Sequence, residues 1–197
     1  MSDDTDLSRR RFLSVATSVT GAVGAGFVAV PFIASWQPSA RARALGAPVE
    51  VDISKLEDGA LMKVTWRGKP VSILRRSSDM LQRMESSGAE LRDPGSEEEQ
   101  QPQYARNEFR SIKPEVLVII SNCTHLGCVP TSRFEVAPAD LGPDWVGGFF
   151  CPCHGSKFDF SGRVFAGVPA PTNLVVPPYR FVDDNTLVIG EDAEVAA

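Results

Sequence analysis

Every cysteine and every histidine of the chain lies in one of two short segments. The first reads Cys-Thr-His-Leu-Gly-Cys from Cys123, and the second reads Cys-Pro-Cys-His from Cys151. The 197 residues contain four cysteines and two histidines in all. Thiolates and imidazoles are common protein ligands of zinc and of iron–sulfur clusters. Because a chance scatter would not gather all six residues, we expect the two segments to converge on one metal site.

Each segment offers one cysteine and one histidine to this site and leaves one cysteine over. The offered pairs are Cys123 with His125 and Cys151 with His154, and the remaining cysteines are Cys128 and Cys153. Structural zinc sites usually pair like ligands, as C-x2–4-C and H-x3–5-H, whereas both segments here mix the two types. Mixed pairs suit a [2Fe–2S] cluster in which one iron binds both cysteines and the other binds both histidines. The remaining cysteines could close a disulfide between the segments, and zinc is the alternative metal.

The paired segments resemble the cluster-binding boxes of the Rieske iron–sulfur proteins, and within that family those of bacterial cytochrome bc1 complexes. The likeness extends to Gly167-Val-Pro-Ala-Pro171 and to the N-terminus. It implies one [2Fe–2S] cluster, two residues on each iron and a disulfide between the loops. The implied inner-iron ligands are Cys123 and Cys151, the outer-iron ligands are His125 and His154, and the implied disulfide joins Cys128 to Cys153.

The resemblance also implies roles for residues beside the ligands. His154 is the better candidate to hydrogen-bond a quinol, with His125 as the second histidine that takes part in the chemistry. Leu126 and Gly127, together with Pro169 of a stiff covering loop over residues 167–171, would shield the cluster and dock the head on cytochrome b. A plain turn is the alternative interpretation of residues 167–171.

Two further positions bear on the redox potential. Ser156 matches a serine whose hydroxyl donates to a cluster sulfur, and such donors raise the potential. Two residues later, many quinol-oxidising members have a tyrosine that donates to a cysteine sulfur, where this chain has Phe158. Histidine ligation moves Rieske potentials to roughly −150 to +300 mV, from about −400 mV in plant-type ferredoxins. Phe158 therefore predicts a potential below that of tyrosine-bearing relatives, suited to a lower-potential quinone.

The function that the resemblance implies is electron transfer within a quinol:cytochrome c oxidoreductase. The cluster would take an electron from ubiquinol, coupled to a proton at a cluster histidine, and pass it to a membrane c-type cytochrome. Cytochrome b and that c-type cytochrome would be the partners in a dimeric, proton-translocating complex. The competing hypotheses are the small Rieske subunit of a periplasmic molybdenum oxidase such as arsenite oxidase, and a Rieske ferredoxin or oxygenase component.

The N-terminus carries an export motif followed by an apolar run. Arg9 and Arg10, ahead of Phe12-Leu13, form a twin-arginine (Tat) signal, a route that exports folded proteins with their cofactors. No charged residue follows between Ser14 and Trp36, a run long enough to cross a hydrocarbon core of about 30 Å. A cleaved signal peptide is the alternative. We expect a retained, single-pass anchor in the bacterial inner membrane, with the head in the periplasm.

Composition and patterning set the remaining expectations. A net charge of −5 argues against nucleic-acid binding. Short apolar runs separated by proline and glycine predict an all-β, antiparallel head on one transmembrane helix, and the resemblance implies that this head is of the Rieske type. The predicted divisions are a cytoplasmic N-terminus (1–13), a transmembrane helix (14–36), a linker-like neck (37–48) and a head (49–197) with a cluster-binding subdomain at about 122–171.

Within the head, we expect strands at 49–53, 61–66, 71–74, 116–120, 145–150, 164–165, 174–176 and 186–189, followed by a polar tail. One or two helical turns at 78–84 are expected to be capped by Ser78 or Asp79. Residues 86–110 are strongly polar, and we expect them to form a surface excursion that carries no chemistry.

Overall fold

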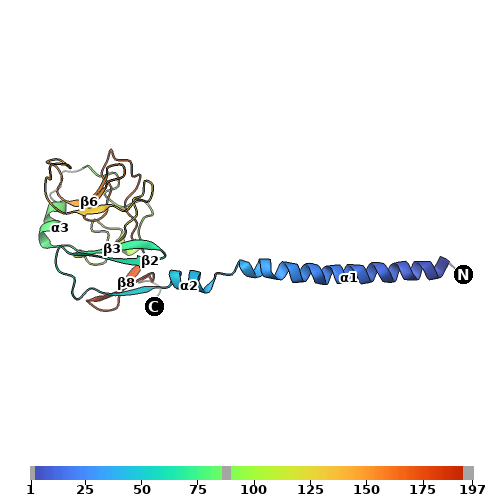
Figure 1. The fold of residues 1–197 in the computed structure, drawn as a ribbon. Coiled ribbons are helices and arrows are strands. Elements are labelled where there is room, and N and C mark those ends of the chain that lie inside the picture. Colours follow the sequence, from blue (N-terminus) through green and yellow to red (C-terminus); the bar gives the residue numbers. More distant parts are fainter. Residues whose placement is uncertain (1–2, 86–89, 193–197) are drawn as a thin grey trace. The chain divides into compact units, whose positions relative to one another are not determined.

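The structure is a computed structural model that describes residues 3–85 and 90–192. It divides into two compact units, residues 1–44 and 45–197 (Figure 1). Residues 1–2, residues 86–89 of the predicted excursion and residues 193–197 of the predicted polar tail lie outside the described residues.

The first unit is dominated by α1 (Asp3–Ser35), a helix of 33 residues. At 1.5 Å per residue it is about 50 Å long, which exceeds the roughly 30 Å of a hydrocarbon core. Within the described residues it belongs to the one helical stretch that is long and apolar enough to cross a membrane, a criterion that signal sequences also meet. Pro31 lies inside the helix, close to its C-terminal end.

The neck is not the plain linker that its sequence suggested, because it contains a short helix, α2 (Ala40–Gly46). The Ser39 hydroxyl caps this helix by accepting a hydrogen bond from the Ala42 amide at 3.1 Å. Alanine and arginine, which fill most of the helix, are both strong helix formers. The proline and glycine residues that flank this short run are typical of a linker, which is why the helix was not predicted.

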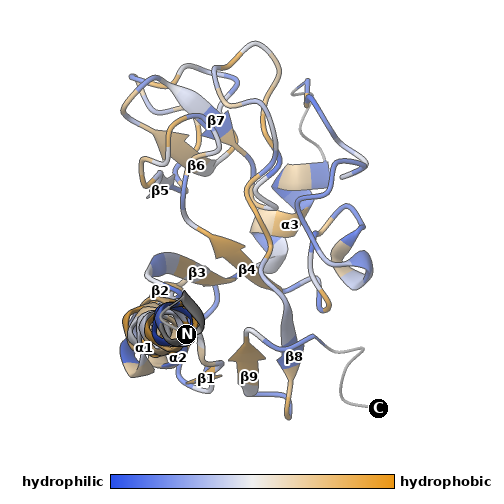
Figure 2. Cartoon of the chain, turned by 90° about the vertical axis from the view of Figure 1, so that its right-hand side faces the viewer, coloured by the Kyte–Doolittle hydropathy of each residue, from blue (hydrophilic) through white to orange (hydrophobic). Residues whose placement is uncertain are grey.

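The head is built from three antiparallel sheets of three strands each, as expected for an all-β domain. The first sheet has the order β1 (Val49–Asp52), β9 (Thr186–Ile189), β8 (Tyr179–Phe181). The second has the order β2 (Leu61–Trp66), β3 (Lys69–Arg75), β4 (Val116–Ile120). The third has the order β5 (Thr131–Arg133), β6 (Gly148–Cys151), β7 (Ser156–Phe158). The β2–β3–β4 sheet lies between the other two (Figure 2).

The middle sheet forms the centre of the hydrophobic core. All five residues of β4 are buried, and Figure 2 shows this strand as strongly hydrophobic. Its neighbour β3 is joined to β2 by a tight turn in which Arg67 and Gly68 both have positive φ (51° and 72°). Two positive φ values are typical of a type I′ hairpin turn, whose twist matches that of the strands. The strands expected at 61–66 and 71–74 are therefore confirmed and form a hairpin, with β3 starting two residues earlier than expected.

One helix packs on the head, α3 (Ser78–Glu85), with Met80 and Met84 buried. Its cap is Ser77, one residue before the predicted caps, since the Ser77 hydroxyl accepts from the Met80 amide at 3.3 Å. Arg83 then donates to the carbonyls of Phe134 and Val146 and so connects α3 to the long β5–β6 connection. A single-turn 3-10 helix, η1 (Gln103–Ala105), follows later in the chain.

The polar stretch after α3 is not a mere surface excursion. Over its described part, Ser96, Ala105 and Arg110 are fully buried. Its backbone also pairs with the segment that follows β7, because the Arg92 amide donates to Val164 O and the Ala166 amide donates to Glu90 O. Polar residues are buried here because they satisfy backbone groups, which hydrophobicity alone does not reveal.

The expected strands at 164–165 and 174–176 are also replaced by irregular structure. Val164 and Phe165 form only isolated bridges, to Phe158 and Leu91. Residues 174–176 are extended and bonded through single contacts, such as the Ile120 amide donating to Val175 O at 2.8 Å. The three short strands β5, β7 and β8 were not predicted.

Candidate metal centre

The first cysteine–histidine segment follows the most deeply buried strand. Directly after β4, Ser121 is held to β3 by a hydrogen bond of 2.5 Å between the Ser72 and Ser121 hydroxyls. The Ser121 amide also donates to Pro70 O at 2.8 Å. The loop then folds back on itself, with the Cys123 amide donating to Cys128 O and the Gly127 amide donating to Cys123 O. A rigid strand end therefore positions this loop.

The second segment is the connection between two paired strands. Cys151 is the last residue of β6 and Ser156 is the first residue of β7, and the two are paired in the sheet. The turn is closed by the Gly155 amide, which donates to Cys151 O at 2.9 Å. Gly155 has φ of 78°, a conformation that favours glycine.

The predicted ligands form an inner and an outer pair. Cys123 and Cys151 are both free cysteines and both buried. His125 is half-buried and His154 is exposed, and their ring centroids lie 4.7 Å apart with the rings nearly perpendicular. This arrangement places two thiols inside and two imidazoles outside, as two irons with different ligand types require.

The buried environment of the inner thiols disfavours their ionised form. Burial raises the pKa of the Cys151 thiol, the neighbouring Cys123 raises it further, and the backbone amides of Cys153 and His154 act against this shift. Two adjacent buried thiols therefore do not become thiolates unaided. A cationic iron centre bound there would favour the thiolate forms, and the amide donors suit a thiolate sulfur.

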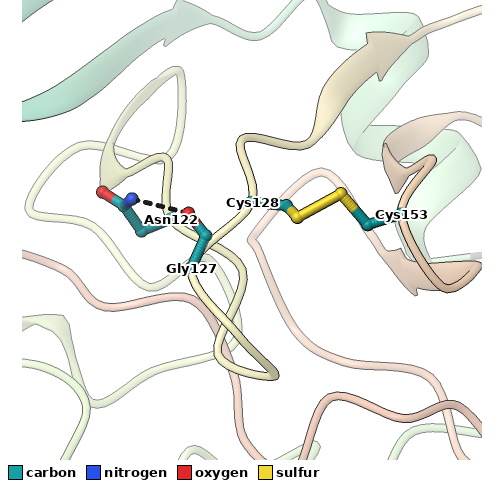
Figure 3. The surroundings of a disulfide bond; sticks show 4 residues. All are labelled: Asn122, Gly127, Cys128 and Cys153. Atoms are coloured by element: carbon teal, nitrogen blue, oxygen red, sulfur yellow. Dashed lines mark hydrogen bonds between the residues drawn. A yellow bond between two sulfur atoms is a disulfide. The ribbon is translucent and has the colours of Figure 1, made fainter.

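The two cysteines left over are joined to each other. Cys128 and Cys153 form a disulfide that connects the two loops across 25 residues of sequence (Figure 3). This is the pairing that the resemblance implies. The sulfur atoms of Cys128, Cys151 and Cys153 lie within 4.8 Å of one another. Cys128 and Cys153 carry no free thiol, because they form the disulfide.

The donor arrangement favours two irons over one zinc. Four donors around a single tetrahedral zinc, bound at about 2.0–2.3 Å, lie about 3.3–3.8 Å from one another. Among the described residues, the three cysteines just named form the only group of at least three metal-binding side chains within 4.8 Å. The four predicted ligands do not form such a group. A two-iron cluster, whose cysteine and histidine ligands bind different metal atoms, fits this wider spacing.

Two hydroxyl groups, one from the first segment and one from β7, bond to the covering loop or to the residue directly after it. From the first segment, the Thr124 hydroxyl donates to Thr172 O at 2.7 Å. From β7, the fully buried Ser156 hydroxyl accepts from the Ala170 amide at 3.0 Å. No described group accepts the Ser156 proton, which leaves it available to a cluster sulfur, as the resemblance implies. The residues predicted to shield or dock, Leu126, Gly127 and Pro169, are all exposed.

Buried arginines hold the turn that follows β7. Arg76 donates to Phe160 O and to the Ser161 hydroxyl, and Arg110 donates to Ser161 O and Gly162 O. Burial lowers the pKa of both arginines to about 10, with Asp159 acting against the shift, so both stay charged at neutral pH. Each buried guanidinium thus donates hydrogen bonds to backbone carbonyls of the turn directly after β7.

Several of these positioning residues were missed in the sequence. Ser72, Thr124 and Arg110 act through hydrogen bonds to residues 48 or more positions away, and no local pattern marks them. Asn122 carried a usable signal, since it is a polar residue directly between a buried apolar strand and the first cysteine.

Two buried thiols, two outer imidazoles and a disulfide between paired loops define a Rieske-type iron–sulfur protein. Comparison with known families agrees: residues 48–180 match the Rieske [2Fe-2S] domain. Residues 1–39 match a family described as "Ubiquitinol-cytochrome C reductase Fe-S subunit TAT signal".

Curated relatives specify the branch. The ubiquinol-cytochrome c reductase iron-sulfur subunit of Allochromatium vinosum is 63% identical over 93% of this chain and 89% of its own length. The subunit of the same name from Blastochloris viridis is 46% identical over 96% of both chains. A chain of a solved hyperthermophilic respiratory complex III shares 27% identity at a TM-score of 0.48, covering 88% of this chain and 98% of that one. The chain belongs to the ubiquinol-cytochrome c reductase iron–sulfur subunits of the Rieske family.

Family membership bears directly on the earlier expectations. The Rieske-type fold, with antiparallel sheets and one long apolar N-terminal helix, is confirmed, as are the Tat signal and one [2Fe–2S] cluster. The individual residue roles, including the ligand assignment, the Ser156 hydrogen bond and the docking residues, stay predictions that the geometry accommodates.

Phe158→Tyr is expected to raise the midpoint potential of the cluster. Phe158 is fully buried in β7, two residues after Ser156. A hydroxyl that donates to a ligand sulfur stabilises the reduced cluster, and one such bond is worth about 40–60 mV for a one-electron couple. Redox titration followed by electron paramagnetic resonance (EPR) measures the shift.

The matched control for this prediction is Phe160→Tyr. Phe160 is equally buried but packs against Phe134, in the β5–β6 connection. We expect no upward shift from this control. An unchanged potential in Phe158→Tyr would mean that the missing hydroxyl does not set the potential of this protein.

Proposed function

We propose that this chain is the electron-transferring subunit of a ubiquinol:cytochrome c oxidoreductase. Its head takes an electron from ubiquinol and delivers it to a membrane-bound c-type cytochrome. Cytochrome b and that c-type cytochrome are its partners in a dimeric complex that contributes to respiratory proton translocation. The observation that carries this proposal is the exposure of His154 and Leu126 on the same two loops that hold the buried thiols of Cys123 and Cys151.

The residue roles follow from burial. Cys123 and Cys151 hold the inner iron, away from water, and His125 and His154 hold the outer iron at the surface. When bound, the cluster supplies a one-electron acceptor of raised potential. His154 presents the accessible imidazole edge, which hydrogen-bonds the quinol hydroxyl and takes its proton as the electron leaves. Leu126, which is 71% exposed, excludes water and docks the head on cytochrome b.

The N-terminal unit anchors the head. Residues 14–36, all but the last of which lie in α1, cross the inner membrane once. Residues 1–13 stay in the cytoplasm, and the twin arginines direct the folded head to the periplasm. Residues 37–48, including α2, form the neck, and residues 49–197 form the head. The length of α1 supports a retained anchor.

Leu126→Glu is expected to leave the cluster intact and to lower quinol oxidation at least about tenfold. The side chain points to solvent, so a charge there costs the head little. Desolvating that charge against an apolar docking surface would cost more than the roughly 1.4 kcal/mol that a tenfold change represents. Quinol:cytochrome c reductase activity of the purified complex, with the reduced-cluster EPR signal as the loading check, measures both effects.

The control is Val182→Glu, which places the same charge at another exposed apolar residue. Val182 is 54% exposed and follows β8, in the sheet at the other end of the head from β5–β6–β7 (Figure 2). We expect normal turnover from this variant. Normal turnover of Leu126→Glu in a fully loaded complex would overturn the docking role, and the absence of quinol oxidation in the wild-type complex would overturn the proposed function.

A further inference from the structure

Asn122 makes a side-chain hydrogen bond that closes the first cluster loop. Its Nδ2 amide donates to Gly127 O at 3.0 Å, across the residues that carry His125 and Leu126 (Figure 3). Figure 3 shows this bond on one side of Cys128 and the disulfide to Cys153 on the other. Both connections therefore hold the C-terminal end of the loop. The Asn122 bond ties it to the start of the loop, and the disulfide ties it to the second loop.

The bond acts at the peptide between Gly127 and Cys128. Peptide units are planar, and the carbonyl and the amide of a trans peptide point in opposite directions. Holding Gly127 O thus also sets the direction of the Cys128 amide, which donates to no described protein group. The Gly127 backbone is in the left-handed region, with φ of 84°, and so depends on its surroundings to keep one orientation.

The amide of Asn122 is only half satisfied. Its Oδ1 atom is buried and has no hydrogen-bond partner among the described residues. A buried acceptor without a partner is unfavourable for folding, and an apolar residue of the same size would remove that cost. The stability of the head alone therefore does not explain an asparagine at this position. Its distinctive contribution is the hydrogen bond from Nδ2 to the loop.

We propose that Asn122 is a positioning residue for the cluster. By holding the Gly127 carbonyl, it fixes the turn that presents His125 and Leu126, in parallel with the Cys128–Cys153 disulfide. This inference rests on the proposed role of His125 as a ligand. Its consequences are a defined orientation of the His125 loop in the intact protein and continued closure of that loop when the disulfide is reduced.

The chain supplies a matched control in Asn107. Its Nδ2 also donates to backbone carbonyls, those of Tyr104 and Ser111, and its Oδ1 is also buried without a partner among the described residues. Asn107 follows η1, whereas Asn122 adjoins a cysteine ligand. Asn107→Leu therefore removes the same kind of interaction without touching the cluster loops.

The experiment compares full-length wild type, Asn122→Leu and Asn107→Leu, each loaded with the cluster and purified in detergent. A phosphine reductant cleaves the disulfide, and the visible circular dichroism of the cluster is followed over time. We expect the signal of Asn122→Leu to decay about fivefold faster than that of wild type, the factor expected for one net hydrogen bond. Before reduction of the disulfide, the EPR line shape of its reduced cluster and its midpoint potential should also differ from wild type. Asn107→Leu should match wild type in all three measurements.

Two results would overturn the proposal. One is an Asn122→Leu protein that equals wild type in decay rate, line shape and potential. The other is faster decay in both variants with unchanged line shape and potential, because that would assign the asparagines to general stability. Failure of the ligand assignment would be seen separately, as a wild-type protein without a Rieske EPR signal.

Discussion

Replacing Cys151 with alanine will yield a chain that holds no cluster. Cys151 is one of two buried free thiols, and the two remaining cysteines, Cys128 and Cys153, are engaged in a disulfide. No spare thiolate is therefore available to replace it on the inner iron. Iron and acid-labile sulfide should fall from about two of each per chain to below about 0.2, and the reduced-cluster EPR signal should vanish.

The control for this variant removes cysteines from the same two loops. In the double variant Cys128→Ala/Cys153→Ala, both inner thiols and both histidines are unchanged, so iron and the EPR signal should be retained. A full complement of iron in Cys151→Ala would refute the ligand assignment. Loss of iron in the double variant alone would mean that the disulfide sulfurs, and not Cys151, contribute to the site.

The same double variant should be considerably less stable than wild type. The disulfide closes a loop with a sequence separation of 25 residues, and the entropy of that closure corresponds to about 3.5 kcal/mol. It also connects the two loops whose burial keeps water from the inner thiols. We therefore expect the guanidinium concentration at which the cluster's visible circular dichroism is lost to fall markedly.

Reduction of the disulfide in wild type provides an independent check of this prediction. The reductant should lower the wild-type transition to that of the double variant and should leave the double variant unchanged. Equal transitions for wild type and the double variant would show that the bound cluster alone holds the loops together.

The meeting of the two cysteine–histidine segments could be predicted better than the elements around them. Metal ligands are restricted to a few residue types at spacings that the cluster imposes, so Cys123, His125, Cys151 and His154 stand out in the sequence. The hairpin of β2 and β3 was predictable for a similar reason, because alternating hydrophobicity and an Arg-Gly turn are local signals.

The misses share a physical cause, which is hydrogen bonding between residues far apart in sequence. Arg110 lies in a polar stretch that looked solvent-exposed, yet it is fully buried because it satisfies the carbonyls of Ser161 and Gly162. The segments at 164–165 and 174–176 are apolar enough for strands, but they bond to single residues of other elements and form no ladder. The hydrophobic pattern of a segment predicts which residues are buried, but it does not predict the hydrogen-bond partner of each backbone group.

The pairing of β1 with β9 has a consequence for synthesis. Val49 pairs with Ile189, and Asp52 pairs with Thr186. The first strand of the head therefore cannot pair with β9 until nearly the whole domain has been translated. At about 5–20 residues per second, that wait lasts roughly 7–30 s. Both cysteine–histidine loops lie between the two strands in the sequence and are translated before β9. The first sheet of the head is therefore completed only after both loops have been made.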